Sequence, residues 1–453
     1  MHRGNKHQSR VVTFAGLSGG INVAQVPEQI AESEMQVCEN FLYASNSMRL
    51  AGRGGLSDAI AVLPAPIKEL YYDVDTNTVF AFLTDRRTYI MKSGSDAAPR
   101  FIDYVTGGEI PVCAKMKDKL WLASGEHLQC FDFCSDSVLN TVTSSPVCDV
   151  CFYRFGRLAV GKTGSDRITF SGTGDGSYWE ENTNDKSAVR WLDVGSDDSG
   201  DIASIVPLAT DLMFIKSNGN IYQLMGDSDP DSWNLPCIAT GVDPAGRSTA
   251  TNIGSEVVFL SLRGLKSLAT TMDYGNITSA DIGSKFNKLI MDKLYEPRIF
   301  HLKRHHTLLI RPSSDWSFFI AYNYGVGAAT VLRFGVQVAS IIETSNEILV
   351  ASGNNVYRMS DEFTTDAGAP INYKLMPKDV IGSEQLLIKA VDTKFTSDRA
   401  GIAAVSTGKL KVDMPTNNRR KVRCNHSTPC ITLTIESNSR FELDHISLEV
   451  VDL

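Results

Sequence analysis

The sequence lacks the features that mark a membrane protein or a nucleic-acid-binding protein. No apolar run among its 453 residues is long enough to span a bilayer, so we expect no membrane insertion. The N-terminus reads MHRGNKHQSR and has no apolar segment behind it, so we expect no cleaved signal peptide. Lys and Arg number 44 against 52 Asp and Glu, and the formal net charge is -8. This balance argues against a protein that grips nucleic-acid phosphates with a basic face.

Motifs that carry known chemistry are also absent. The chain has no GxSxG, no HExxH and no phosphate-cradling GxxxxGK[ST]. Two groups of residues have some features of a metal site. His301 and His305 would share one face of a strand, and Asp197, Asp198 and Asp201 lie in a loop of calcium-site character. The histidines have basic neighbours and no carboxylate near in sequence, so we interpret them as a solvated hairpin turn. The acidic loop lacks the distant bidentate Glu of an EF-hand.

The cysteines also fail to form a recognisable framework. They number nine, and their odd count and scattered spacing favour a reducing compartment over a disulfide-rich fold. Cys130, Cys134, Cys148 and Cys151 have spacing close to that of a zinc site, but they lie in strand-like segments without a tight glycine turn. We interpret these four as small buried hydrophobic residues. The sequence therefore predicts no catalytic residue, no cofactor and no metal.

What the sequence does contain is a repeated phrase of two apolar runs around a polar or glycine-containing turn. The first residues of successive copies lie between 38 residues apart (Leu120 to Leu158) and 54 residues apart (Leu158 to Leu212). This is the period of a four-stranded propeller blade, and each phrase is typical of a β-hairpin. The seven phrases start at Val79, Leu120, Leu158, Leu212, Val257, Leu308 and Ile348. The sequence predicts an all-β fold with a β-propeller of about seven blades, although six or eight would fit nearly as well.

Three further segments differ from the repeats. Residues 1–56 predict an extended N-terminal arm with a helix-compatible piece, IAESEMQVCENF, at 30–41. The arm either donates a strand that closes the propeller of residues 57–365 or clasps a neighbouring subunit. A long acidic insertion from Ser171 to Asp201 contains Trp179 and Trp191, and loops of this length are usually functional or interfacial. Residues 366–453 alternate apolar and polar residues and predict a small C-terminal β-sandwich.

Three phrases together resemble a known family. They are GLSGGINVAQVPEQIAESEMQVCENFLYASNSMRLAGRGGL, RLAVGKTGSDRITFSGTGDGSYW and CITLTIESNSRFELDHISLEVVDL. They resemble the opening, a blade phrase and the terminal strand pair of the β-propeller tail proteins of short-tailed (podovirus-type) bacteriophages, known as tail hub, nozzle or tail-tubular proteins. The likeness covers most of the chain in layout but rests on short phrases. The chain departs from some members in having room for a large insertion only around Trp179.

The resemblance implies a structural virion protein rather than an enzyme. It implies a homo-oligomeric ring, a hexamer, that extends the DNA-ejection channel below the portal and adaptor proteins and above a distal needle or fibres. The protein would be made in the host cytoplasm and located in the virion tail, and DNA would pass through the lumen without specific binding. The acidic balance of the chain agrees with a duct that does not retain a polyanion.

We expect the arm and the Ser171–Asp201 loop to make head-to-tail assembly contacts in such a ring. The basic run that includes Arg419 and Arg420 is interpreted either as a modest nucleic-acid contact or as a loop that meets an acidic neighbour. The candidate contact residues are Phe14, Leu17, Ile21, Val23, Asn40, Arg49, Arg53, Trp179, Trp191, Arg419 and Arg420.

An alternative is a carbohydrate-binding or glycan-cleaving propeller that acts as a receptor-binding protein. Trp179, Trp191 and Trp233 would then be stacking platforms, but no pair of carboxylates is fixed beside them by the sequence. A propeller scaffold of the WD40 kind has less support, since no Gly-His or Trp-Asp signature recurs.

Overall fold

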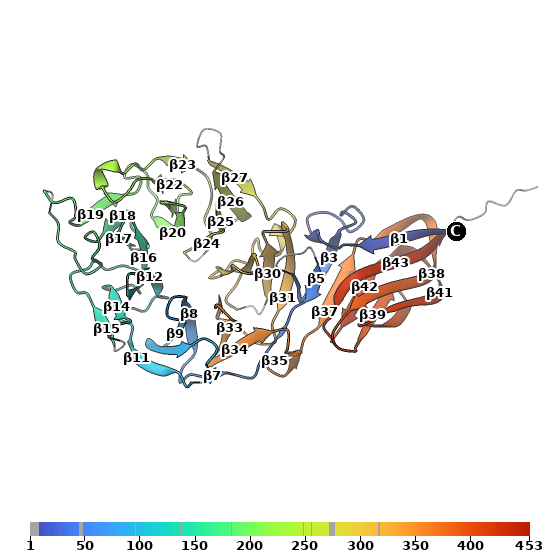
Figure 1. Cartoon of the computed structure of the whole chain (residues 1–453). Helices are drawn as coiled ribbons and strands as arrows, with labels where there is room; N and C mark the ends of the chain where they lie inside the picture. The colour runs from blue at the N-terminus through green and yellow to red at the C-terminus, as the bar shows by residue number, and fades with distance from the viewer. Residues whose placement is uncertain are drawn as a thin grey trace, which may run out of the picture.

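The protein is elongated, with a ring of small sheets at one end and a sandwich of two larger sheets at the other (Figure 1). This computed structural model describes residues 9–44, 49–95, 97–135, 138–182, 184–247, 249–254, 256–270, 277–315 and 318–453. The expectation about the first residues of the chain falls largely on 1–8, outside this part. Among the described residues, no helix has the length and apolar character needed to cross a membrane.

The ring consists of seven antiparallel sheets, which we number as blades 1 to 7. Blades 1 and 2 contain β8 (Ile67–Asp73), β9 (Thr78–Leu83), β10 (Arg87–Lys92) and β11 (Arg100–Tyr104), then β12 (Val112–Met116), β13 (Lys119–Ala123), β14 (Gln129–Asp132) and β15 (Leu139–Thr141). Blades 3 and 4 contain β16 (Val150–Arg154), β17 (Arg157–Gly161), β18 (Arg167–Phe170) and β19 (Arg190–Asp193), then β20 (Ile202–Leu208), β21 (Asp211–Lys216), β22 (Ile221–Leu224) and β23 (Cys237–Ala239). Blades 5 and 6 contain β24 (Ala250–Asn252), β25 (Glu256–Ser261), β26 (Gly264–Thr270) and β27 (Ile277–Asp281), then β28 (Arg298–Leu302), β29 (Thr307–Arg311), β30 (Phe318–Asn323) and β31 (Ala328–Arg333).

Blade 7 draws its strands from both ends of the chain. Its first three strands are β32 (Ser340–Glu343), β33 (Ile348–Ser352) and β34 (Asn355–Ser360). The outer edge of β34 is paired antiparallel by two short strands from the N-terminal side, β6 (Gly55–Leu56) and β7 (Ala61–Val62). Of the two alternatives for the N-terminal arm, the donated strand is therefore present within this chain.

Contacts between neighbouring blades close the ring. First strands of successive blades touch at β12 with β16, β20 with β24, β24 with β28 and β28 with β32, and β32 touches β8 to complete the circle. Hydrophobic clusters fill all seven interfaces between adjacent blades. The predicted β-propeller is confirmed, and the number of blades is seven.

The repeated phrase follows from this packing. The second strand of a blade is covered on both faces by the neighbouring blades, so it is a continuous apolar run without polar alternation. All six residues of β9 are buried, as are all five of β17 and of β29. The turn between the two apolar runs needs unusual backbone angles. Gly264 has φ +120 and lies so close to Asn287 that any Cβ would collide with its amide, so glycine is required there.

The sandwich at the other end combines C-terminal strands with strands of the N-terminal segment. One sheet contains β4 (Phe41–Tyr43), β5 (Leu50–Gly52), β43 (Glu442–Asp452), β38 (Val380–Thr396) and β41 (Arg419–Ile431), with β1 (Ser9–Ala15) also paired to β43. The other contains β37 (Tyr373–Pro377), β42 (Thr434–Ser437), β39 (Ile402–Thr407) and β40 (Leu410–Pro415). The predicted C-terminal β-sandwich is confirmed, with the added finding that N-terminal strands complete it.

The N-terminal segment also joins the sandwich to the propeller. Strand β3 (Glu34–Glu39) pairs with β37 of the sandwich on one side and, through Glu39 and Val331, with β31 of blade 6 on the other. β2 (Gly20–Ile21) lies beside β3, while β35 (Thr365–Asp366) and β36 (Ala369–Pro370) extend the sheet of blade 7 through β6. Two single 3-10 turns, η1 (Pro230–Ser232) and η2 (Asn287–Leu289), complete the described elements.

The prediction that residues 30–41 are compatible with a helix was wrong. The segment forms strand β3, not a helix. Met35 and Cys38 are completely buried, and backbone pairing with β37 supplies the hydrogen bonds that a helix would have made internally. The helix propensity of this segment is weak because the segment is short and poorly capped, and pairing with β37 therefore decided its conformation.

A buried ion pair lies where arm, propeller and sandwich meet. Both guanidinium NH2 groups of Arg53 bond to the Asp366 carboxylate, at 2.8 and 2.5 Å. Its remaining donors reach Asn40 Oδ1 at 3.1 Å and the carbonyl oxygens of Gly54 and Arg333 at 2.9 and 2.7 Å. All five N–H groups of this fully buried side chain are thus satisfied. Asn40, at φ 65, also donates to the Asn372 carbonyl at 2.7 Å.

We predict that Arg53→Met destabilises the protein by about 3–5 kcal/mol, because it leaves the Asp366 carboxylate buried without its counter-charge. Urea unfolding followed by tryptophan fluorescence would measure the change. Arg49→Met is the matched control, since Arg49 is exposed and pairs with Glu442 and Asp444 at 3.6 and 3.5 Å at the surface; its loss should cost under about 1 kcal/mol. Equal midpoints for the two variants would show that the buried pair adds nothing to stability.

Candidate functional site

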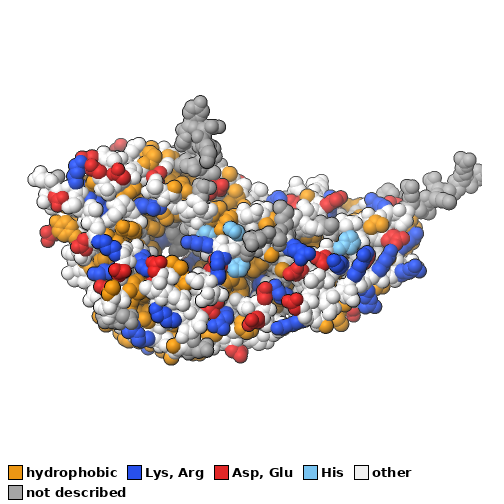
Figure 2. Space-filling view, in the orientation of Figure 1, with side chains coloured by type: hydrophobic (Ala, Val, Ile, Leu, Met, Phe, Trp, Pro, Cys, Tyr) orange, Lys and Arg blue, Asp and Glu red, His pale blue; other side chains and the backbone are white. Residues whose placement is uncertain are grey.

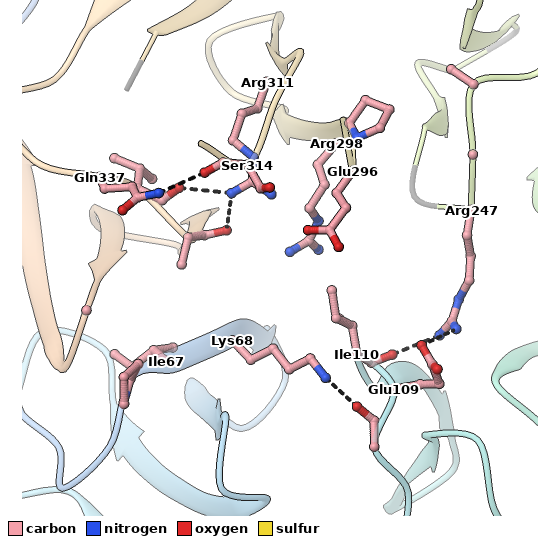
Figure 3. A pocket seen from close by; sticks show the side chains of 18 residues that line it. Ile67, Lys68, Glu109, Ile110, Arg247, Glu296, Arg298, Arg311, Ser314 and Gln337 are labelled. Carbon is pink, nitrogen blue, oxygen red and sulfur yellow. Dashed lines mark hydrogen bonds and ion pairs between the residues drawn. The ribbon is translucent and has the colours of Figure 1, made fainter. Parts of the chain in front are cut away.

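A concave site lies at the centre of the propeller, at one rim. It is a cavity of about 800 Å³. Its lining comes from the segments that lead into the first strands of blades 1, 2, 5, 6 and 7, as Figure 3 shows from close by. Four cationic side chains and two carboxylates line it: Lys68, Arg247, Arg298, Arg311, Glu109 and Glu296.

Two of these arginines face each other on neighbouring strands of blade 6. Arg298 and Arg311 are direct partners in the antiparallel pair β28–β29. Glu69, on β8, forms an ion pair with Arg298. Arg311 is 6% exposed and donates to the backbone carbonyl oxygens of Val338 and Ala339, at 2.9 and 3.2 Å. Burial and the neighbouring charge of Arg298 lower the pKa of Arg311 to about 10.

Arg247 lines the same cavity. It enters from the segment before blade 5 and donates to the carbonyl oxygens of Ile110, before blade 2, and Asp149, before blade 3, at 2.8 and 2.7 Å. Its guanidinium also lies 3.2 Å from the Asp149 carboxylate and 3.5 Å from that of Glu109. These contacts link the segment before blade 5 to the segments before blades 2 and 3 across the centre of the propeller. Sequence reasoning missed all of these residues, because they are far apart in the chain and belong to no motif.

Several predicted assembly residues are buried inside the chain itself. Phe14, Leu17 and Ile21 are 2–3% exposed and belong to the core cluster shared by the sandwich and blades 5 and 6. Asn40 and Arg53 form the buried junction with Asp366 described above. These side chains contact their own chain, so they are not available to a neighbouring subunit in this structure. Their apolar or polar surface is already used in joining the arm to the fold.

The remaining predicted residues at the sandwich end are accessible. Arg49 is exposed, and Val23 is half-buried in a groove beside β3. Arg419 pairs with Asp392 at 2.6 Å, and Arg420 donates to the Asp413 carbonyl at 3.1 Å, yet both side chains are exposed at the start of β41. Figure 2 shows Lys and Arg side chains gathered over this end of the molecule, with Asp and Glu among them.

The tryptophans do not form a shared platform. Trp179 is 9% exposed, packs in the cluster between blades 2 and 3, and donates its ring N–H to the Gly176 carbonyl at 2.9 Å. Trp233 packs against Phe155 and Phe170. Of these three tryptophans, only Trp191, on β19, is well exposed, at 47%, and the guanidinium of Arg167 lies 4.0 Å from the centre of its ring. A stacking site built from all three rings is not present.

The Ser171–Asp201 loop is anchored by buried cations. Arg157 donates to the carbonyl oxygens of Ser171 and Ala188, at 2.8 and 2.6 Å, and so holds both ends of the first half of the loop. Lys216 donates to the carbonyl oxygens of Val194 and Gly195 and pairs with Asp198. Burial opposes ionisation of Asp198, but hydrogen bonds from Lys216, Asn220 and Tyr222 outweigh it and lower its pKa. This carboxylate is engaged by protein donors and holds the loop in place.

The histidine segment forms the predicted hairpin turn at residues 303–306, where Lys303, Arg304 and His306 are exposed, but the prediction was wrong for His301. His301 lies on β28, half-buried, and hydrogen-bonds with the Tyr324 hydroxyl at 3.1 Å. His305 lies 2.6 Å from Glu343, a carboxylate that is distant in sequence. Only folding brings that carboxylate to the basic turn. Burial, together with Lys303, lowers the pKa of His301 to about 4.

The cysteine interpretation holds for three of the four residues. Cys130, Cys148 and Cys151 are buried, and burial raises the pKa of each thiol. Cys134 is exposed just beyond the end of β14, so for this residue the prediction was wrong. The reason is that β14 ends at Asp132, and Cys134 lies in the turn that leads to β15 of the same blade.

Comparisons with known proteins give a likeness of shape only. No family model and no curated protein sequence matches this chain. Similar solved structures include the WD40 β-propeller domain of Doa1 (14% identity, TM-score 0.45, covering 68% of this chain and 96% of that one). They also include the Cps50 (Swd1) β-propeller domain of Myceliophteria thermophila (10%, 0.47, 65% and 96%) and BamB from Moraxella catarrhalis (10%, 0.41, 70% and 93%). At TM-scores below 0.5 these likenesses carry no argument about what this chain does.

We predict that His301 makes the protein less stable in mild acid. Its pKa is lower in the folded state (about 4) than in the unfolded chain (about 6.5), so unfolding takes up a proton between these values and stability falls as the pH drops. From pH 7.5 to pH 5, the wild type should lose about 2 kcal/mol more than His301→Asn, measured by urea unfolding at both values. Parallel losses in the two proteins would contradict a buried neutral His301.

Proposed function

We propose that this chain is a structural subunit of a bacteriophage tail, part of a hub or nozzle ring that extends the DNA-ejection channel below the portal and adaptor. The observation that carries the proposal is the way the resembling phrases meet in space. Strand β5 of the N-terminal phrase pairs with β43 of the C-terminal phrase, and β1, which lies immediately before the N-terminal phrase, pairs with β43 as well. The N-terminal arm, which is part of the resemblance, is therefore integrated into the fold, and it pairs with the C-terminal strand of the chain.

The positions of the accessible candidate residues support a head-to-tail ring. Trp191 lies on β19 at the far side of the propeller, and Arg419 and Arg420 lie on β41 at the opposite end of the molecule (Figure 1). These two surfaces are too far apart to touch within one chain. One surface can contact the other only on a neighbouring copy, and such a heterologous contact is the kind that builds a closed ring. A rigid connection between propeller and sandwich, through β3 and the Arg53–Asp366 pair, would keep the ring geometry uniform.

The path of DNA in this proposal is the centre of the ring of subunits. Arg247 links blade 5 to the segments before blades 2 and 3 across the centre of the propeller, so we place the duplex between subunits and not through a single chain. The net charge of -8 suits a wall that DNA passes without being held. The partners would be the adaptor and portal on one side and a distal needle or fibres on the other.

The test is quantitative mass spectrometry of purified virus particles from the source, with the major capsid protein as the reference. We expect this chain at a few copies per particle, near the content of one ring. Absence from washed particles would overturn the tail proposal. In that case glycan binding at the exposed Trp191 would be the next function to measure.

We predict that Trp191 and Arg420 contribute to the contact between subunits of the ring. Trp191→Ser and Arg420→Glu should each weaken self-association of the purified chain by about tenfold or more, since exposed aromatic and Arg side chains are the usual anchors of an interface. Mass photometry over a concentration series would measure it. Lys288→Glu, a similar charge change at an exposed position between blades 5 and 6, is the control. If all three variants assemble like the wild type, these two surfaces are not the contact.

A further inference from the structure

The central cavity contains an arrangement that structural stability alone does not explain. Arg298 and Arg311 are directly opposite in an antiparallel strand pair, where side chains share one face and like charges destabilise the sheet. The carbon at the centre of each guanidinium lies near the Phe300 ring, 5.0 Å from its centroid for Arg298 and 5.9 Å for Arg311. The two cations are therefore held side by side over one aromatic ring at the wall of a cavity.

Their charges are only partly neutralised. The Glu69 carboxylate that pairs with Arg298 also accepts a hydrogen bond from Ser340 at 2.8 Å. Arg311 bonds to backbone carbonyl oxygens, and the described contacts include no ion pair between it and a carboxylate. The buried Nε atoms of both arginines have no hydrogen-bond partner within the described part of the chain. Buried donors without partners are costly, and the depressed pKa of Arg311 has the same origin in burial and crowded positive charge.

The opposite wall adds further donors. Figure 3 shows Lys68 entering from the wall formed by blade 1, across the cavity from Arg298 and Arg311. Its ammonium contacts the Gly108 carbonyl, and Arg247 lines the same space. A volume of about 800 Å³ is within the range of small-molecule sites. None of the 18 lining residues in the described part of the chain is aromatic, so these residues do not offer the stacking surface that a neutral sugar prefers.

We propose that this cavity binds a small oxyanion, a molecule that carries a phosphate or carboxylate group, between Arg298 and Arg311 and opposite Lys68. Guanidinium groups present paired N–H donors that match the oxygens of both anions, and charge-assisted hydrogen bonds of this kind are the strong ones. Glu69 and Glu296 offset part of the positive charge of Arg311, and the bound anion would add to that counter-charge. This site is independent of the proposed role in a phage tail.

The test is isothermal titration of the full chain with inorganic phosphate and, separately, with citrate, each against sodium chloride at the same ionic strength. We expect saturable binding at one site per chain for at least one of the two anions. The preferred anion would distinguish a phosphate-bearing from a carboxylate-bearing ligand. Absence of saturable binding of both anions would overturn the proposal.

Variants locate the site. Arg311→Gln and Lys68→Gln should each raise the dissociation constant about tenfold or more, while Lys288→Gln, exposed and outside the cavity, should leave it unchanged. Lys68 is not in the buried pair, so its variant serves as the test should Arg311→Gln fail to fold. Unchanged binding in Lys68→Gln and in any folded Arg311→Gln would mean that the anion occupies the outer surface only, and would overturn the proposal. Loss of anion binding when the chain self-associates would also overturn the proposal, because an acidic side chain of a second copy would then occupy the cavity.

Discussion

The fold depends on one buried ion pair, between Arg53 and Asp366. Every donor of the guanidinium is satisfied, so the pair avoids the large penalty of an unpaired buried charge. Its partners come from the N-terminal arm, from blade 6 and from the strand that leads out of blade 7. Tyr373, at the start of the sandwich, donates its hydroxyl to the Arg53 carbonyl at 2.9 Å. The constraint is geometric as well as energetic, because these segments can satisfy one guanidinium only when propeller, arm and sandwich are all in place.

The propeller adds a second constraint, that of closure. A ring of seven sheets has no free interface between blades only if the last blade packs on the first, and here β32 and β33 contact β8. The outer edge of blade 7 is then covered by β6 and β7 from the opposite end of the chain, which removes an exposed strand edge. The same N-terminal segment completes the sandwich through β1. One extended stretch without a core of its own thus stabilises both parts of the molecule.

Several buried cations anchor loops, but the arginines of the central cavity differ from them in their surroundings. Arg53, Arg157 and Lys216 each hold irregular backbone by donating to several carbonyl oxygens, and Arg53 and Lys216 also have a carboxylate partner. Arg311 resembles them in bonding to carbonyl oxygens, but it stands opposite a second arginine and beside an open volume. That difference is why we assign the cavity a ligand and the other cations a structural role.

The sequence by itself determined the propeller, because strands buried on both faces must be continuous apolar runs and their tight turns must carry glycine or polar residues. Both signals are local, and they predicted seven hairpins and the sandwich of residues 366–453. The tertiary structure decided whatever depends on residues distant in the chain. Glu343 and His305 are 38 positions apart, Asp366 and Arg53 are 313 positions apart, and no local pattern encodes such pairs. The segment at 30–41 became a strand for the same reason, since its hydrogen-bond partner β37 lies more than 300 residues away, and pairing with it outweighed a weak helical preference.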